Sequence, residues 1–196
     1  RINEKFTELK RKNEKALIAY IMMGFPNEKA TITTVRGLVK GGADIIELGF
    51  PFSDPLADGP VIQNASTVSL EKGTNISKFF NLVKKIRKET DIPLVLMTYT
   101  NILYHRGYEK FISEAKSAGI DGFILPDMSI EESKEYTKSA ENKADTIFLI
   151  SPNTSKTRIE KIAKISETDF EIINSIFEKE KDLLKEFGYK IINNDK

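Results

Sequence analysis

The residues best suited to chemistry follow one apolar segment in the first half of the chain. Glu47 lies inside the apolar run 44–49, where a charged group costs free energy unless it is paired, hydrated or protonated. If its side chain points into a pocket at the end of a strand, desolvation raises its pKa, as a carboxyl that transfers protons requires. Asp58 lies in the following loop and could fold back over the same pocket. Two such carboxyls can divide the work, one moving protons and one staying charged.

A structural role explains the same two residues equally well at this stage. Glu47 could belong to an ion pair, and Asp58 could cap a helix. Because structural ion pairs perturb pKa values as catalytic sites do, residue type and spacing leave both interpretations open.

Other candidate residues close the neighbouring apolar runs. Tyr20 ends the first run, Met97 and Tyr99 end the third, and Asp127 follows the fourth. Aromatic and thioether side chains at such positions suit a flat apolar ligand, although ordinary core packing accounts for them too. Asp127 could instead cap a helix that begins near Ile130.

Apolar runs alternate with helical patterns along the chain. The pattern predicts strands over residues 16–23, 44–49, 93–98, 121–125 and 146–150, and helices over residues 28–40, 65–72, 76–88, 108–118, 130–141, 155–165 and 167–187. Short apolar strands without polar alternation are typical of parallel sheets covered on both faces. Repeated strand–helix units predict a doubly wound sheet or a (β/α) barrel, in which functional residues lie at the carboxyl ends of the strands.

Composition excludes several classes of function. Lys and Arg number 30 against 29 Asp and Glu, so the net charge of +1 provides no field for nucleic acid or an anionic membrane surface. Cys is absent, which excludes disulfides, thiolate metal sites and cysteine nucleophiles. The single histidine, His105, is expected in an exposed loop, and it leaves no histidine metal cluster, so we expect no metal. No apolar run reaches membrane-spanning length, and a cytoplasmic protein is expected.

The motifs around these residues resemble one enzyme family. Residues 42–63, GADIIELGFPFSDPLADGPVIQ, look like the signature of tryptophan synthase α subunits, with unusual Pro and Asp spacing. Four further blocks match in the same order, at residues 16–26, 93–111, 118–127 and 148–159. The resemblance covers roughly residues 1–166 and implies a (β/α)8 TIM-barrel fold.

The resemblance also implies an activity. The family performs a step of tryptophan biosynthesis, the retro-aldol cleavage of indole-3-glycerol phosphate to indole and glyceraldehyde 3-phosphate, without metal or organic cofactor. By this resemblance Glu47 is the general acid and base, and Asp58 stabilises positive charge on the indole nitrogen. The expected pocket wall comprises Tyr20, Met97, Tyr99 and Asp127. Asp54 and Pro55 fall on the loop that resembles the contact surface for the β subunit, a pyridoxal-phosphate enzyme, in an α2β2 heterotetramer.

The length of the chain sets a further expectation. A (β/α)8 barrel needs about 250 residues. We therefore expect a single incomplete barrel domain over residues 1–196, with about five strand–helix units and a C-terminal helix and tail over residues 167–196. Strands six to eight and the family's glycine-rich phosphate-binding loops are expected to be missing, through an internal stretch left out of the sequence, truncation or genuine shortening.

Two alternative functions follow from that expectation. A catalytically impaired homologue could act as a binding or regulatory subunit for a β-type partner. Another phosphate-binding barrel enzyme, such as a sugar-phosphate isomerase, is disfavoured because it does not explain the motif over residues 47–60.

Overall fold

The computed structural model describes residues 1–55, 58–151 and 154–165 of the chain. The chain divides into two compact units, Arg1–Thr146 and Ile147–Lys196. The candidate residues named above all belong to the first unit. The helix predicted over residues 167–187 and the tail after it lie outside the described residues, and the single incomplete domain stays a prediction.

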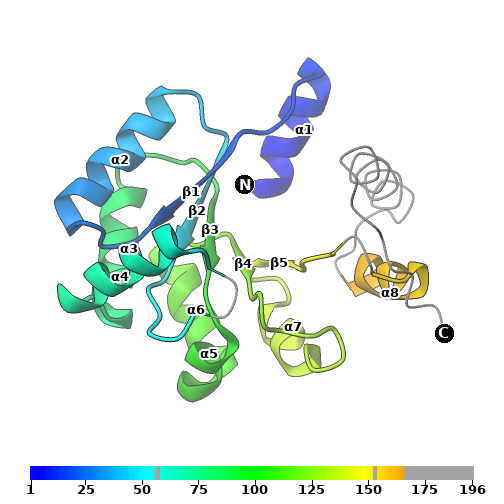
Figure 1. The fold of residues 1–196 in the computed structure, drawn as a ribbon. Coiled ribbons are helices and arrows are strands. Elements are labelled where there is room, and N and C mark those ends of the chain that lie inside the picture. The colour runs from blue at the N-terminus through cyan, green and yellow to red at the C-terminus, as the bar shows by residue number, and fades with distance from the viewer. Residues whose placement is uncertain (56–57, 152–153, 166–196) are drawn as a thin grey trace, which may run out of the picture. The chain divides into compact units, whose positions relative to one another are not determined.

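All five predicted strands are present and lie in one sheet in chain order (Figure 1). The first four are parallel, each hydrogen-bonded to the next. The strands are β1 (Ile18–Met22), β2 (Ile45–Gly49), β3 (Leu94–Met97), β4 (Gly122–Ile124) and β5 (Asp145–Ile147). The helices are α1 (Ile2–Lys12), α2 (Glu28–Lys40), α3 (Pro60–Glu71), α4 (Ile76–Arg87), α5 (Thr100–Arg106), α6 (Tyr108–Ala118), α7 (Lys134–Ala140) and α8 (Lys156–Ile165).

The predicted helices differ from the observed ones in four places. Helix α3 begins at Pro60 rather than at residue 65, because a proline suits the first turn of a helix. Helix α1 was not predicted, because its sequence is dominated by charge, yet it buries Ile2 and Leu9. Helix α5 was not predicted either, because it has only seven residues, and it carries the exposed His105 that was expected in a loop. Helix α7 begins at Lys134 rather than at residue 130, because residues 130–133 form a turn.

The register of the strands sorts their side chains onto two faces. Tyr20 pairs with Glu47, and Glu47 pairs with Val95. Because side chains alternate along a strand, these three residues and the residues two positions farther on point to the same side. This side, termed the site face, carries Tyr20, Met22, Glu47, Gly49, Val95 and Met97.

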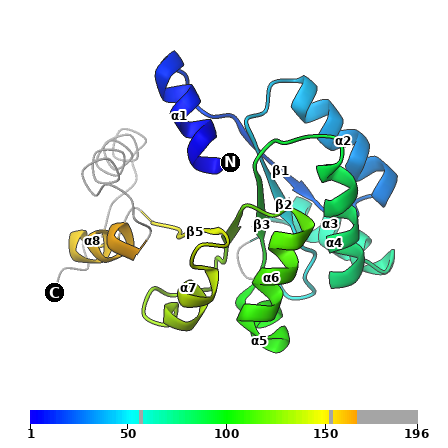
Figure 2. The same ribbon diagram turned by 180° about the vertical axis from the view of Figure 1, so that it is seen from behind.

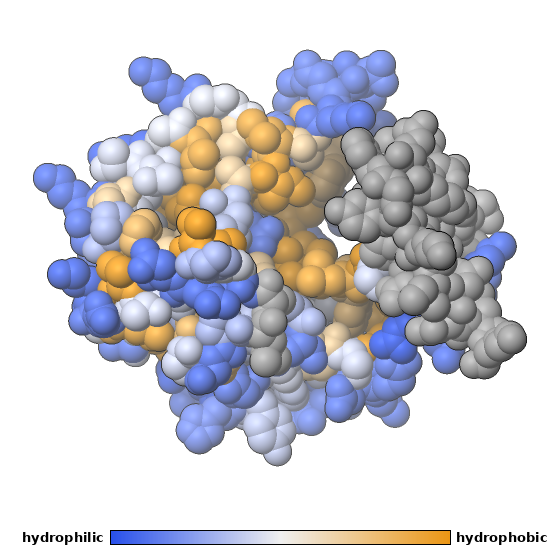
Figure 3. Space-filling view, viewed as in Figure 1, coloured by the Kyte–Doolittle hydropathy of each residue, from blue (hydrophilic) through white to orange (hydrophobic). Residues whose placement is uncertain are grey.

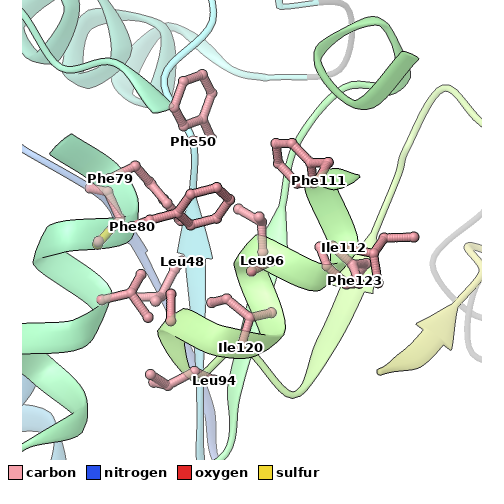
Figure 4. Close-up of a cluster of buried hydrophobic side chains, with 14 of the residues drawn as sticks. Leu48, Phe50, Phe79, Phe80, Leu94, Leu96, Phe111, Ile112, Ile120 and Phe123 are labelled. Atoms are coloured by element: carbon pink, nitrogen blue, oxygen red, sulfur yellow. The ribbon is translucent and has the colours of Figure 1, made fainter. Parts of the chain in front are cut away.

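The opposite face, termed the helix face, holds the hydrophobic core. It carries Ile46, Leu48, Leu94, Leu96 and Phe123, none of which is more than marginally exposed. Figure 2 shows α2, α4 and α6 along the same side of the strands. Aromatic residues of α4 and α6 reach into this core (Figure 4), and the rings of Phe80 and Phe111 meet edge to face at 5.4 Å between centroids.

Apolar side chains also reach the surface beside β1, which is an end strand of the sheet. Leu17 and Ile18 are 56% and 50% exposed, and Figure 3 shows apolar residues at the surface on the side where β1 begins. Within the described residues, no helix is long and apolar enough to span a membrane.

A charged network closes the amino ends of β3 and β4. The Asp121 carboxylate accepts hydrogen bonds from the guanidinium groups of Arg87 and Arg1, each at 2.8 Å, and from the backbone N–H of Leu94 at 2.9 Å. The side chains of Arg87 and Asp121 are only 13% and 7% exposed. Arg87 also donates to the carbonyls of Gly119, Thr90 and Ile92. The network therefore fixes the points at which β3 and β4 begin.

Replacing Asp121 should destabilise the protein strongly. Asp121→Ala leaves a buried guanidinium and a backbone N–H without their acceptor, so the free energy of unfolding should fall by about 3 kcal/mol in urea titrations. The matched control is Arg36→Ala, which removes a two-pronged ion pair to Glu89 at a side chain that is 62% exposed. It should cost less than about 1 kcal/mol. Equal losses in the two variants would contradict this account.

Candidate active site

Glu47 occupies the centre of β2 on the site face. Its neighbours in the strand, Ile46 and Leu48, are fully buried on the helix face, and its own side chain is half-buried. Burial raises the pKa of the Glu47 carboxyl above its usual range. Among the described residues it forms no ion pair, so the structural alternative for this residue is not supported. A half-buried carboxyl of this kind holds its proton more readily than an exposed one, which suits an acid.

Tyr20 lies beside Glu47 and leans across the sheet. Its ring covers Gly49, the residue two positions beyond Glu47 on the same face. A Cβ built on Gly49 would overlap the Tyr20 hydroxyl and approach Cζ to 2.7 Å. Only glycine leaves room for the ring at this position, so Gly49 fixes where the Tyr20 phenol sits.

The electrostatics of Tyr20 link it to both candidate carboxyls. The pKa of its phenol is raised, first by burial and then by the negative charges of Asp58 and Glu47, with a smaller contribution from Tyr99. Tyr20 therefore stays a neutral hydrogen-bond donor at neutral pH. The charges of both carboxylates therefore reach the same phenol.

Asp58 ends the loop that joins β2 to α3. It is half-buried, and its backbone carbonyl accepts a hydrogen bond from Gln63 Nε2 at 2.8 Å. The N-cap position of α3 is held by Gly59, and Pro60 opens the helix. The interpretation of Asp58 as the capping residue is therefore wrong.

An apolar wall flanks the carboxyls. Met97 pairs with Gly49 in the register and so shares the site face. Tyr99 follows two residues later and is 5% exposed, and its ring stacks on Phe52 with centroids 4.7 Å apart and planes 30° apart. The stacked pair fixes an almost fully buried aromatic ring two residues beyond Met97.

Asp127 has its carboxylate engaged at the start of α5. Its oxygens accept hydrogen bonds from the Thr100 backbone N–H, at 2.9 and 3.1 Å, and from Thr100 Oγ1 at 2.9 Å. The predicted cap for a helix near Ile130 is therefore wrong, because Asp127 satisfies the first turn of α5 and Ser133 holds the N-cap position of α7. Through Thr100 it fixes the backbone next to Tyr99.

Asp54 and Pro55 lie on the loop between β2 and α3. Asp54 is exposed and accepts a hydrogen bond from Ser53 Oγ at 2.5 Å, whereas Pro55 is half-buried. No hydrogen bond observed among the described residues joins Asp54 or Pro55 to the carboxyl of Glu47 or Asp58. Their place on the surface loop is compatible with a role at an interface.

Sequence reasoning missed four residues that shape the site. Gly49 was detectable, because it lies two positions after Glu47 on a strand and so must share its face. Phe52, Gln63 and Ser66 carry no such signal, because their roles depend on how the loop returns to α3. Their contacts involve partners 5 to 47 residues away, which a local pattern does not report.

Comparison with known proteins identifies relatives of one kind. The sequence profile of the family described as tryptophan synthase alpha chain matches residues 6–173. The tryptophan synthase alpha chain of Methanosarcina barkeri is 50% identical over 163 residues, which is 83% of this chain and 61% of the relative. That of Geotalea uraniireducens is 45% identical over 166 residues, or 84% and 62% of the two chains. The chain thus spans about three-fifths of the length of the curated relatives it matches.

Solved structures agree with the sequence comparison. The tryptophan synthase subunit alpha of Legionella pneumophila superposes with a TM-score of 0.81 at 37% identity, covering 84% of this chain and 64% of that one. A chain of the tryptophan synthase a2b2 complex from Pyrococcus furiosus gives 0.73 at 38% identity, covering 77% and 62%. The likeness confirms the predicted (β/α)-barrel class for the strands and helices that are matched.

The raised pKa of Glu47 predicts a pH-dependent effect on stability. A carboxyl whose pKa is raised on folding favours the folded state when it is protonated, and this stabilisation is lost as the pH rises through the folded pKa. Glu47→Gln keeps a neutral side chain of similar shape. Its free energy of unfolding should match that of the wild type near pH 4 and exceed it at pH 7. Urea titrations at both pH values measure the difference, and a Gln variant less stable at pH 7 would refute the assignment.

The close contact of the Tyr20 ring with Gly49 predicts that substitutions at these two positions have coupled effects on stability. Gly49→Ala should lower the free energy of unfolding by about 1–3 kcal/mol, because the added methyl group displaces the ring. In a Tyr20→Ala background the same change should cost much less, since the overlapping atoms are gone. Thermal or urea unfolding of the four proteins in this double-mutant cycle gives the coupling, and additive effects would show that ring and glycine do not touch.

Proposed function

Because the chain belongs to the tryptophan synthase alpha chain family, we propose that it carries the family's carbon–carbon lyase site and cleaves indole-3-glycerol phosphate to indole and glyceraldehyde 3-phosphate. The observation that carries the proposal is Glu47: a half-buried carboxyl in the middle of β2 on the site face, without an ion-pair partner among the described residues, whose pKa is raised by burial. No metal or organic cofactor takes part in the proposed reaction.

Glu47 moves two protons in the proposed reaction. As an acid it protonates the indole ring carbon that bears the glycerol chain, which makes that carbon tetrahedral and places positive charge on the ring nitrogen. The carbon–carbon bond then breaks, its electron pair returns to the ring, and the glycerol hydroxyl becomes the aldehyde carbonyl. Glu47 takes up the hydroxyl proton, which restores its starting state. Its raised pKa supports this role, because the protonated form persists closer to neutral pH.

Asp58 stabilises the intermediate in this proposal. A carboxylate that faces the ring nitrogen offsets the charge that develops when the ring carbon is protonated. Its influence on the Tyr20 phenol supports a place on the same side of the sheet as Glu47. Tyr20 itself remains neutral and can donate one hydrogen bond in the site.

The pocket wall is proposed to hold the indole ring. Met97, Tyr99 and Tyr20 supply apolar surface on the site face, and the stacking of Tyr99 on Phe52 supports a rigid flat wall. Asp127 contributes by fixing the backbone beside Tyr99 through Thr100, since its carboxylate is already engaged there.

The partner and location are proposed on the same family basis. Asp54 and Pro55 are assigned to the surface that meets a tryptophan synthase β subunit, and the exposure of Asp54 supports this. A related chain has been solved as part of an a2b2 complex. An α2β2 assembly in the cytoplasm follows as the proposed state.

Indole release tests the proposal directly. The chain is mixed with indole-3-glycerol phosphate, with and without a tryptophan synthase β subunit, and the rate of indole formation is measured. Glu47→Gln should lower the rate by about 10²–10⁴-fold, because the group that donates and accepts the protons is gone. Asp58→Asn should also lower it, since the amide carries no compensating charge.

The matched control is Glu28→Gln, on the exposed first turn of α2, which should retain the wild-type rate. An active wild type whose Glu47→Gln variant is equally active would refute the role of Glu47. Binding of the β subunit without any indole release would favour the non-catalytic binding subunit instead.

A further inference from the structure

We propose that Ser66 is a positioning residue that, together with Gln63, ties Phe52 and Asp58 to helix α3 and so fixes the backbone on which Asp58 is held. The inference deepens the proposed function, since it rests on Asp58 acting in the same site as Glu47. Ser66 touches no group assigned to the reaction and acts through the backbone of the loop.

Ser66 makes a two-way bond with the start of the loop. Its hydroxyl oxygen accepts the backbone N–H of Phe52 at 2.7 Å, and the hydroxyl donates to the carbonyl oxygen of the same residue at 2.8 Å. Ser66 is 1% exposed, so water does not readily replace these bonds. One small side chain therefore satisfies both backbone groups of the residue whose ring stacks on Tyr99.

Gln63 holds the other end of the loop. Its Nε2 donates to the Asp58 carbonyl at 2.8 Å. Gln63 and Ser66 are three residues apart, so they lie on the same side of α3. The helix thus contacts the loop just after β2 and again at Asp58 itself.

Helix α3 is in turn anchored to the sheet. Ser69, three residues beyond Ser66 and fully buried, donates to the carbonyl of Met23 at 2.6 Å. The backbone N–H of Met23 bonds to the carbonyl of Gly49 at 3.0 Å, at the end of β2. Neighbouring Gly24, at φ +80°, leaves no space for a Cβ beside Ser69 and Thr74. Gln63, Ser66 and Ser69 therefore form one polar row along α3. Through these contacts the helix links the backbone of Asp58 to the end of β2, the strand that bears Glu47.

Three variants separate this role from a general loss of stability. Ser66→Ala removes both bonds to Phe52 and adds no bulk, whereas Ser66→Thr restores the hydroxyl. The matched control is Thr67→Ala, which removes an exposed hydroxyl on the same helix that bonds to the Gln63 carbonyl within α3 itself.

Two readouts do not depend on activity. Amide hydrogen exchange at Phe52 should accelerate about tenfold or more in Ser66→Ala, while exchange at Phe50, whose N–H bonds to the Met97 carbonyl at 2.9 Å, should stay unchanged. The ¹³C resonance of the Asp58 carboxyl should move in Ser66→Ala and return in Ser66→Thr. Thr67→Ala should leave both signals at their wild-type values.

Activity gives the third readout. In the indole-release assay, kcat of Ser66→Ala should fall on the order of 10–100-fold, because a charge displaced by an ångström no longer faces the ring nitrogen. KM should change far less, and Ser66→Thr should recover most of the lost kcat.

The outcomes distinguish this inference from the proposed function. An unshifted Asp58 resonance in Ser66→Ala overturns the positioning role, and so does an unchanged kcat in an active protein. If the wild type releases no indole, the proposed function fails, and the Asp58 resonance then decides the positioning role alone.

Discussion

The structure depends on the parallel register that places Tyr20 next to Glu47 and Glu47 next to Val95. A shift of one residue would turn Glu47 into the aromatic core of the helix face and bring Leu48 to the site. Burial of Ile46 and Leu48 against α4 and α6 prevents that shift, because a shift in either direction would expose these large apolar side chains. The apolar residues of β2 thus determine the environment of the one acidic residue among them.

The two faces of the sheet contribute in different ways. The helix face is dry and densely packed, with interlocking rings from α4 and α6, and it supplies the hydrophobic stabilisation. The site face holds a half-buried carboxyl without an ion-pair partner among the described residues, and this arrangement costs stability. Such a cost is common at functional sites, where a pKa suited to proton transfer is obtained by giving up a more favourable contact.

Much of the fold could be predicted from the sequence, because each strand is a compact apolar run bounded by turn residues. Counting in steps of two along β2 relates Glu47 to Gly49, whereas the place of Met97 on the same side follows from the register between β2 and β3. The elements that escaped prediction were those whose stability comes from distant partners. Helix α5 is too short to show a period and depends on Asp127, 27 residues away from the N–H that it accepts.

Some residues of the candidate site could be found from the sequence, and others could not. The two candidate carboxyls could be named from motif and strand position, whereas the contacts of Asp127 and Ser66 depend on the backbone that each side chain binds. Asp127 could also have capped a later helix, but its carboxylate binds Thr100. Side chains that bond to a remote backbone leave no local pattern, so Ser66 looks like any other serine on a helix.

The charged network of Asp121, Arg87 and Arg1 lies at the amino ends of β3 and β4, whereas the chemistry is assigned to the carboxyl ends. Stabilisation of the strands and the assigned chemistry therefore depend on different residues at opposite ends of the strands. Substitutions that strengthen the network at the amino ends could raise the thermal stability of the protein without changing the residues assigned to the reaction. For the same reason, substitutions at the carboxyl ends can change specificity while the charged network still holds the amino ends of β3 and β4 in place.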